Sequence, residues 1–277
     1  MHERKEKVAG NSVTVAAIQA LPIGHLLNPK NVPHAVDLLK EAAGRGVDLA
    51  CFPEAYPASG EEEIRKVAQD LRIFVIASFL VKESGGLYNE SILIGSAGQV
   101  IGRQRKVHPV PVLEPFARGD NYVPMETPWG KIGILICIDG WGFPEGFYRL
   151  SAEGVDLVFN PCLIFKKKPQ KRMSLLGRVL DYKLPIVAPN NAFWPLKIFP
   201  EDRGLPAEGG GSLILAPPAY HNQVEIERFM REAASCEDWI LAEGGKEEEI
   251  LVAKIDLYAL RRARSIWNDC FGACLLS

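Results

Sequence analysis

The stretch GILICIDGWGFPE, residues 133–145, decides how the chain is organised. It opens as an apolar, β-branched run that is typical of a buried strand, and it closes on two glycines, a proline and a glutamate. Glycine permits a tight turn, and Pro144 followed by Glu145 is typical of the first turn of a helix. The sequence therefore predicts a strand-to-helix elbow with Cys137 at the bend.

Cys137 has two interpretations on this stretch alone. A thiol close to the positive N-terminus of a helix has a lowered pKa and is a candidate nucleophile. A cysteine between isoleucines is also typical of a small apolar core residue, and this stretch alone favours that interpretation, because free cysteines are often buried. The choice between these two interpretations depends on residues elsewhere in the chain.

Outward from the elbow, strands and helices alternate on both sides. Strands are predicted at residues 13–19, 47–52, 73–79, 91–95, 100–105, 132–138, 155–160, 186–190, 211–215 and 250–255, and helices at about 29–43, 59–71, 144–153 and 170–183. Two helix starts rest on local signals: Asn28-Pro29 as an N-cap with proline in the first turn, and Ser59 with Glu62 as a capping box. The alternation predicts an α/β fold with largely parallel sheets in one domain, residues 1–277. The order occurs twice, which indicates two similar halves around one core, although a plain doubly wound sheet would give much the same string.

Composition argues against several functional classes. The 277 residues are 47% apolar and 24% charged, and 32 Lys plus Arg against 34 Asp plus Glu give a net charge of -2, so neither nucleic acid nor an anionic membrane is expected as a partner. The N-terminus has no apolar signal region and no stretch approaches the roughly 18 apolar residues of a membrane span, which predicts a cytoplasmic protein. The six cysteines are expected to be reduced. Cys270 and Cys274 lack a second pair of ligands, so no metal is expected.

Two further segments place reactive side chains after predicted strands. Glu54 ends the segment CFPE, where the carboxyl end of an α/β strand commonly faces a ligand, although an acid there is also typical of a solvated loop or a helix cap. Lys106 lies in the segment GRQRKVHP, where a predicted strand ends. It is either a reactive lysine or part of a basic strand end exposed to water. His108 is either a general base or an ordinary hydrogen-bonding side chain, and no Ser or Cys lies beside it to form a dyad.

Taken together, the order Glu54, Lys106, Cys137 in these contexts resembles the nitrilase, or carbon-nitrogen hydrolase, superfamily, whose catalytic triad is Glu-Lys-Cys. The resemblance covers nearly the whole chain, from residue 13 to residue 256. Secondary matches are the loop with Glu114, Phe116 and Gly119-Asp120, which resembles the loop of the family's second glutamate, Arg149 on the helix after the nucleophile, and Gly210-Gly211-Ser212 before a late strand.

The resemblance implies a four-layer αββα sandwich, with two sheets face to face and helices outside. It implies that Glu54 takes the proton of Cys137, and that Lys106 and the backbone N–H of Ile138 stabilise the oxyanion formed on an amide-type carbonyl. It also implies that Glu114 holds Lys106 and helps to place the substrate. The reaction would pass through a thioester on Cys137 and would need no metal or organic cofactor.

The position two residues after the nucleophile narrows the implied reaction. Nitrile hydrolysers of the family usually have Glu there, whereas Asp139 is the pattern of amide and N-carbamoyl hydrolases, so a small amide or N-carbamoyl substrate is expected. Trp141 and Cys162 are expected to line the pocket, with packing of the elbow and burial after a strand as their alternatives. The basic run at residues 166–168 and 171–172 either attracts an acidic substrate or covers a solvated face.

Three competing functions remain open. A catalytically silent relative would bind a partner or metabolite, but a binding protein has no need to combine a thiol, an amine and a carboxylate. A true nitrile hydrolase would share the triad. A domain that produces ammonia for a synthetase would be expected to carry a second domain, which this sequence does not show.

Peripheral segments carry expectations of their own. Residues 1–11 are expected to be a flexible tail, residues 220–239 to contain an amphipathic helix, and residues 257–277 to be a C-terminal extension. Apolar residues on the two helices of the second half predict a homo-oligomer, a dimer or larger. The loop after Glu54 is short for the family, so the entrance to the site is expected to be more open or completed by a partner subunit.

Overall fold

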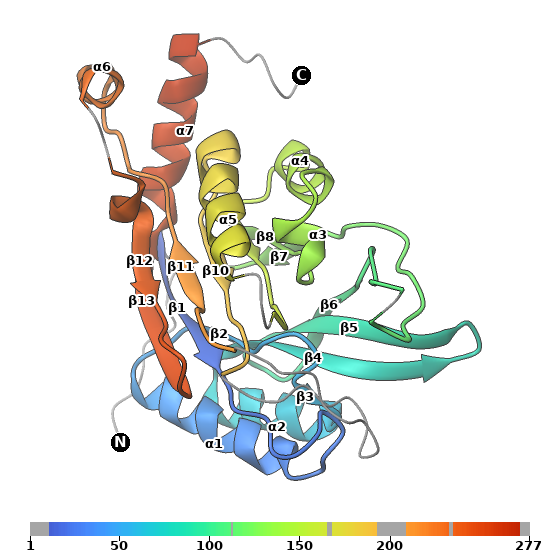
Figure 1. The fold of residues 1–277 in the computed structure, drawn as a ribbon. Helices are drawn as coiled ribbons and strands as arrows, with labels where there is room; N and C mark the ends of the chain where they lie inside the picture. Colours follow the sequence, from blue (N-terminus) through green and yellow to red (C-terminus); the bar gives the residue numbers. More distant parts are fainter. Residues whose placement is uncertain (1–10, 112, 165–167, 193–208, 233–234, 272–277) are drawn as a thin grey trace.

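The computed structural model describes residues 11–111, 113–164, 168–192, 209–232 and 235–271. Within these ranges the chain forms two sheets between layers of helices (Figure 1). The arrangement is the layered αββα sandwich that the resemblance implies.

The two sheets are mixed. The first has seven strands in the order β13-β1-β2-β4-β5-β6, with β3 paired to β4: β1 (Ser12–Gln19), β2 (Leu49–Cys51), β3 (Pro57–Ala58), β4 (Phe74–Glu83), β5 (Gly86–Ile94), β6 (Val100–Arg105) and β13 (Glu249–Asp256). The second has six in the order β12-β11-β10-β9-β8-β7: β7 (Met125–Thr127), β8 (Gly130–Ile134), β9 (Leu157–Phe159), β10 (Ile186–Ala188), β11 (Leu213–Leu215) and β12 (Ile240–Glu243). Parallel strand pairs are β1-β2-β4 with β3 and β8-β9-β10, with one isolated parallel bridge between Cys162 and Asn190, and the remaining described strand pairs are antiparallel. The expectation of largely parallel sheets therefore holds only for the middle of each sheet, because hairpins and returning strands extend the edges.

Alternating side chains of the strands build three apolar layers. In β1, Val13, Val15 and Ala17 face the space between the sheets, whereas Ala16 and Ile18 face the opposite side. The second sheet repeats this pattern, with Ile132, Ile134, Leu157, Phe159, Val187 and Ile214 inward and Leu135, Val158, Ile186, Leu213 and Leu215 outward. Because both faces are covered, these strands read in the sequence as continuous apolar runs.

Helices cover the outer face of each sheet (Figure 1). α1 (Asn31–Gly44) and α2 (Glu61–Leu71) pack on the first sheet, and α4 (Glu145–Ala152) and α5 (Lys168–Tyr182) pack on the second. The carboxyl ends of β2 and β8 lead into the loops that carry the predicted site residues.

Two predicted helix starts are wrong. α1 begins at Asn31 rather than directly after Asn28, and α2 follows Gly60, while Ser59 provides no capping bond. Gly60 has φ +80°, and a Cβ there would lie 2.7 Å from a methyl group of Val32 at the start of α1. The two helix starts therefore pack against each other, and this contact is not visible in local capping signals.

The hairpin between β4 and β5 is longer than the sequence predicts. The predicted strands 73–79 and 91–95 extend until Glu83 pairs with Gly86, so that the hairpin projects from the sandwich (Figure 1). The short edge strands β7 and β12 were also not predicted. β5 matters for the site because it runs beside β6 and Lys106.

The C-terminal part of the described chain returns to both sheets. β13 pairs antiparallel with β1, and α7 (Leu257–Phe271) is tied to the loop before β9 by Arg261 and Arg264, which both bind Asp156. The predicted amphipathic helix is present as α6 (Gln223–Arg231), followed by the short 3-10 helix η1 (Cys236–Trp239). Most of the expected N-terminal tail and the end of the expected extension lie outside the described residues.

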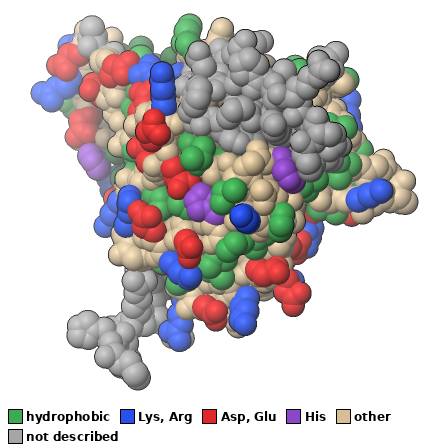
Figure 2. All heavy atoms as spheres, turned by 60° about the horizontal axis from the view of Figure 1, so that its bottom comes forward, with side chains coloured by type: hydrophobic (Ala, Val, Ile, Leu, Met, Phe, Trp, Pro, Cys, Tyr) green, Lys and Arg blue, Asp and Glu red, His purple; other side chains and the backbone are tan. Residues whose placement is uncertain are grey.

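The face that includes α1 and α2 carries interspersed acidic and basic side chains, with no single-sign patch on the visible described atoms (Figure 2). None of the helices in the described ranges has the length and apolar character needed to cross a bilayer.

Candidate active site

Cys137 lies on the predicted elbow, between β8 and the short helix α3 (Ile138–Trp141). Its φ of 52° is a conformation that residues other than glycine rarely adopt. The Cys137 N–H donates to the Pro161 carbonyl at 2.8 Å, and its own carbonyl accepts from the Gly140 N–H and from Asn160 Nδ2, both at 3.0 Å. Gly140 is required there, since a Cβ would lie 2.6 Å from Asn160 Nδ2. Strained residues fixed in this way cluster at functional sites.

Glu54 lies just beyond β2 and is 2% exposed. Its backbone N–H donates to the Cys162 carbonyl at 3.3 Å, which joins the first sheet to the loop after β9 of the second. Its Oε1 accepts from Lys106 Nζ at 2.7 Å and from Asn89 Nδ2 at 2.8 Å. Its Oε2 is buried and has no hydrogen-bond partner in the described part of the chain, so this oxygen is available to take a proton.

Lys106 follows β6 and is completely buried. Its Nζ lies 2.7 Å from Glu54 Oε1 and 2.6 and 2.8 Å from the two carboxylate oxygens of Glu114. An ammonium group is costly to bury alone, and the two carboxylates compensate this cost. The contact expected between Glu114 and Lys106 is present.

Burial and charge act in different ways on the pKa values of this pair. Burial raises the pKa of the Glu54 carboxyl well above its usual range, a thiolate at Cys137 would raise it further, and the Lys106 charge only partly opposes this. Burial acts to lower the pKa of Lys106, but the attraction of Glu54, Cys137 and Glu114 outweighs it and raises that pKa. Lys106 therefore stays a fixed positive charge, while Glu54 is poised to gain and lose a proton.

The expectation of a lowered pKa at Cys137 is wrong. A hydrogen bond with the Cys162 thiol and then burial raise the pKa of Cys137, and the Lys106 charge acts in the opposite direction. α3 has only four residues, so its dipole is small. The resting group is a thiol, and a base is needed to make it a nucleophile.

Asp139 joins the elbow to the lysine loop, the segment that follows Lys106 and begins with Val107 and His108. Its buried carboxylate accepts from the backbone N–H of Val107 at 2.9 Å, from that of His108 at 2.8 Å and from His108 Nδ1 at 3.0 Å. Asp139 thereby fixes the position of Lys106 relative to Cys137. His108 takes part as a hydrogen-bonding side chain of this joint, which is the alternative interpretation given for it above.

The N-terminus of α3 offers a free donor. Among the described residues, no acceptor bonds the backbone N–H of Ile138, the residue directly after Cys137. This N–H and the Lys106 ammonium are the two groups that the resemblance assigns to oxyanion stabilisation.

A hollow of about 550 Å³ opens beside Glu114 and Ile138. It is lined by Val107, His108, Pro109, Val110, Pro111, Glu114, Phe116, Arg118, Ile138 and Phe143. The expected wall residue Trp141 is not among them, because it packs against the apolar clusters on both faces of the second sheet. Cys162 is not among them either, since it is fully buried beside Cys137.

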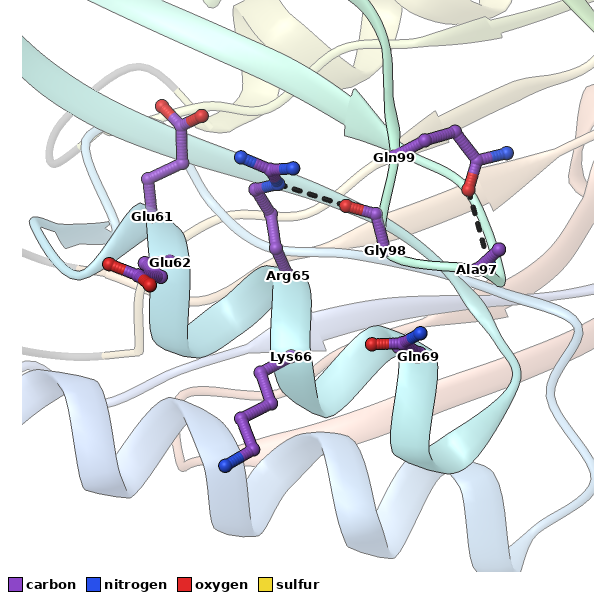
Figure 3. Close-up of a pocket in the computed structure, with 8 residues that line it drawn as sticks. All are labelled: Glu61, Glu62, Arg65, Lys66, Gln69, Ala97, Gly98 and Gln99. Carbon is purple, nitrogen blue, oxygen red and sulfur yellow. Dashed lines mark hydrogen bonds between the residues drawn. The ribbon is translucent and has the colours of Figure 1, made fainter.

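A second hollow, of about 500 Å³, lies between α2 and the β5–β6 turn and is separate from these residues (Figure 3). Arg65 Nε donates to the Gly98 carbonyl across it at 2.9 Å. Its lining mixes acidic and basic surface side chains and contains no thiol, so concavity alone does not identify the candidate site.

The basic run does not reach the candidate site as a group. Lys171 is fully buried and donates to the Gly211 carbonyl at 2.8 Å, and Arg172 pairs with Glu237 and Glu243. Residues 166 and 167 lie outside the described residues. The described residues of this run therefore do not form a patch for an acidic substrate. They do not form a wholly solvated face either, because Lys171 is buried.

Asn89 is the site residue that sequence reasoning missed. It lies on β5, and its carbonyl accepts from the Lys106 N–H at 2.9 Å, which brings its side chain to Glu54. A single asparagine in a strand carries no motif. Only the pairing of β5 with β6 could have indicated it.

In the described ranges, no cluster of three or more His, Cys, Asp or Glu side chains has the arrangement of a metal site. The chemistry available here is that of a thiol, a carboxylate, an ammonium group and a backbone N–H.

This fold and sequence place the chain in a known class of hydrolases. The chain belongs to the carbon-nitrogen hydrolase family, whose sequence model matches residues 14–219. It is 29% identical to a nitrilase of Pyrococcus abyssi over 94% of this chain and 96% of that protein. It is 24% identical to an omega-amidase of Xenopus tropicalis, with 85% and 86% covered, and 25% identical to an N-carbamoylputrescine amidase of Solanum lycopersicum, with 78% and 72% covered.

A solved structure has the same fold. The carbon-nitrogen hydrolase from Helicobacter pylori G27 superposes with a TM-score of 0.77 over 97% of this chain and 99% of that chain, at 22% sequence identity. The structural likeness thus supports the sandwich fold, and the match to the sequence model supports the family.

Proposed function

We propose that the protein is a thiol hydrolase that cleaves the C–N bond of a small amide or N-carbamoyl compound, with Cys137 as nucleophile. The observation that carries this proposal is the buried network in which one Lys106 ammonium binds both Glu54 and Glu114 beside the Cys137 elbow. A structural ion pair would not require a strained thiol as its neighbour.

In the first step Glu54 acts as general base. Its free Oε2 takes the proton of the Cys137 thiol as the sulfur attacks the carbonyl carbon of the substrate. Burial raises the pKa of Glu54 and makes its carboxylate a stronger base for this transfer, and the raised pKa of the Cys137 thiol is the reason that a base is needed. The carbonyl oxygen gains the negative charge of the tetrahedral intermediate.

Lys106 and the Ile138 N–H stabilise that oxyanion. The lysine supplies a fixed positive charge in a buried site, where electrostatic stabilisation is stronger than in water. Protonated Glu54 returns its proton to the leaving nitrogen, so ammonia or an amine departs and a thioester remains on Cys137.

Water completes the cycle. Glu54, again ionised, takes a proton from a water molecule that attacks the thioester carbonyl. The acid is released, the Cys137 thiol regains its proton and the starting state is restored. Every proton moved in this scheme passes through Glu54.

The amide or N-carbamoyl class is supported by the names of two relatives, an omega-amidase and an N-carbamoylputrescine amidase. Asp139 also fits that class on the family pattern. The main alternatives are nitrile hydrolysis, which the name of the Pyrococcus relative favours, and a catalytically silent protein with this fold.

The proposal is tested by ammonia release from a panel of small amides, omega-amides, N-carbamoyl amino acids and nitriles. We expect turnover of an amide or N-carbamoyl compound. In Cys137→Ala we expect the rate to fall at least about a thousandfold, because the substitution removes the nucleophile while changing the side-chain volume only a little. Cys236→Ala is the matched control, since Cys236 is an exposed free cysteine on η1. Turnover of nitriles alone, or full activity in Cys137→Ala, would overturn the proposal.

A further inference from the structure

The acidic side chains in and next to the 550 Å³ hollow have partners. Glu114 binds Lys106 with both oxygens, and its Oε2 also accepts from the Val110 N–H at 3.2 Å. Asp139, behind His108, is satisfied by two backbone N–H groups and the imidazole. Glu145, two residues after the lining residue Phe143, pairs with Arg149 at 2.7 Å.

Arg118 is the exception among the lining residues. It forms no ion pair with any residue in the described ranges, although it lines the hollow. Arg118 is an exposed residue, but its backbone is held beside Lys106, because the N–H of the next residue, Gly119, donates to the Lys106 carbonyl at 2.8 Å. A cation attached directly beside the lysine loop is therefore available to a ligand in the hollow.

The neighbouring lining residue His108 is already engaged by other side chains. His108 Nδ1 is bonded to Asp139, and the ring packs on Phe143 with centroids 4.4 Å apart. A guanidinium stays charged at all working pH values and matches a carboxylate with two parallel N–H donors.

The other walls of the hollow are mainly apolar. Val110, Pro111, Phe116, Ile138 and Phe143 line them. Such walls accept a short hydrocarbon spacer. Ile138, the residue directly after Cys137, is one of them, so a substrate in the hollow can extend toward the thiol.

We propose that Arg118 binds an anionic group at the end of the substrate remote from the scissile C–N bond. This assignment rests on the proposed hydrolase function and narrows its substrate class to amides or carbamoyl compounds that end in a carboxylate. A substrate that ends in an ammonium group is disfavoured, because it would meet an uncompensated like charge.

The test measures kcat/KM for three kinds of probe. Succinamate and glutaramate are the anionic probes, and alkyl amides of the same length, in which an isopropyl group replaces the carboxylate, are the neutral probes. An amide with an aminomethyl group at that end is the cationic probe. In the wild-type protein we expect the order anionic, neutral, cationic. In Arg118→Gln, we expect the anionic-to-neutral ratio to fall at least about tenfold, mainly through KM, because the contact is equally strong in ground and transition states.

Arg262→Gln provides the matched control, since Arg262 is exposed on α7, away from the hollow, and the substitution changes the net charge equally. Arg118→Glu should reverse the order of the anionic and cationic probes. Added salt should lower the wild-type preference for the anionic probe and should have less effect in Arg118→Gln.

The outcomes separate the two proposals. If the wild-type protein hydrolyses amides but its anionic-to-neutral ratio is the same in Arg118→Gln, the Arg118 assignment is wrong and the hydrolase proposal stands. If no amide or carbamoyl compound is hydrolysed at all, the proposed function itself fails, and the assignment fails with it.

Discussion

The pKa of Glu54 depends on Asn89, a neighbour that takes no part in the proposed reaction. Asn89 donates to the same carboxylate oxygen as Lys106 and leaves the other oxygen free. A donor to the charged form stabilises the carboxylate, so Asn89 and Lys106 both limit how far burial raises the pKa of Glu54.

This balance predicts the pH dependence of the reaction. Glu54 has to be ionised to accept a proton, and its pKa is raised by burial, so the acid limb of kcat/KM should lie above the range of an ordinary carboxyl. Asn89→Leu removes a donor to the ionised form, which raises the pKa further and should move this limb upward by about one pH unit. A pH profile of both proteins measures the shift. An unchanged or lowered limb, in a variant whose unfolding transition is intact, would contradict this role.

At the scale of elements, the site depends on contacts between segments far apart in the sequence. The elbow was predictable, because its glycines and proline signal a turn and a helix start locally. The raised pKa of Cys137 was not predictable, because burial beside Cys162 is a tertiary property that local spacing does not carry. The start of α2 at Gly60 likewise depends on packing against α1.

The joint at Asp139 gives a test at this scale. In Asp139→Asn the amide NH₂ group cannot accept, so one of the two backbone N–H groups of Val107 and His108 loses its partner. We expect a loss of about 1–3 kcal/mol in the free energy of unfolding. We also expect kcat/KM to fall at least about tenfold, because Lys106 is no longer held against the elbow.

Urea unfolding and steady-state kinetics measure the two effects. Asp120→Asn is the control, since Asp120 is an exposed aspartate of the loop that follows Lys106. Wild-type stability and kinetics in Asp139→Asn would show that the joint is not needed.

For the whole molecule, the sequence predicts the layers of the sandwich but not the edges of its sheets. The layered fold was predictable from the alternation of elements and the family resemblance, whereas the antiparallel edges and the long β4–β5 hairpin were not, because short or half-buried strands carry little periodicity. Subunit contacts also lie beyond a single chain, and the homo-oligomer stays a prediction.

Most of the apolar residues on the outer helices of the second sheet are buried within the subunit, and the prediction now rests on a few exposed ones. Tyr148 on α4 is 55% exposed, and Met173 and Leu180 on α5 are 73% and 45% exposed. Sedimentation at micromolar concentration should give a mass of at least twice 30.6 kDa. Met173→Glu should shift it toward the monomer, whereas Met230→Glu, on exposed α6, should not. A fully active wild-type monomer would contradict the prediction.

The central claim is a covalent intermediate on Cys137, and mass spectrometry of the quenched reaction tests it most directly. With an amide that the protein turns over slowly, the peptide that contains Cys137 should gain the mass of the acyl group, and the adduct should disappear as the acid forms. In Glu54→Gln we expect little acylation, since the base is lost. Accumulation of adduct in that variant would mean that Glu54 serves mainly the water step. Turnover of the amide with no adduct on Cys137 at any time, together with activity in Cys137→Ala, would contradict the mechanism.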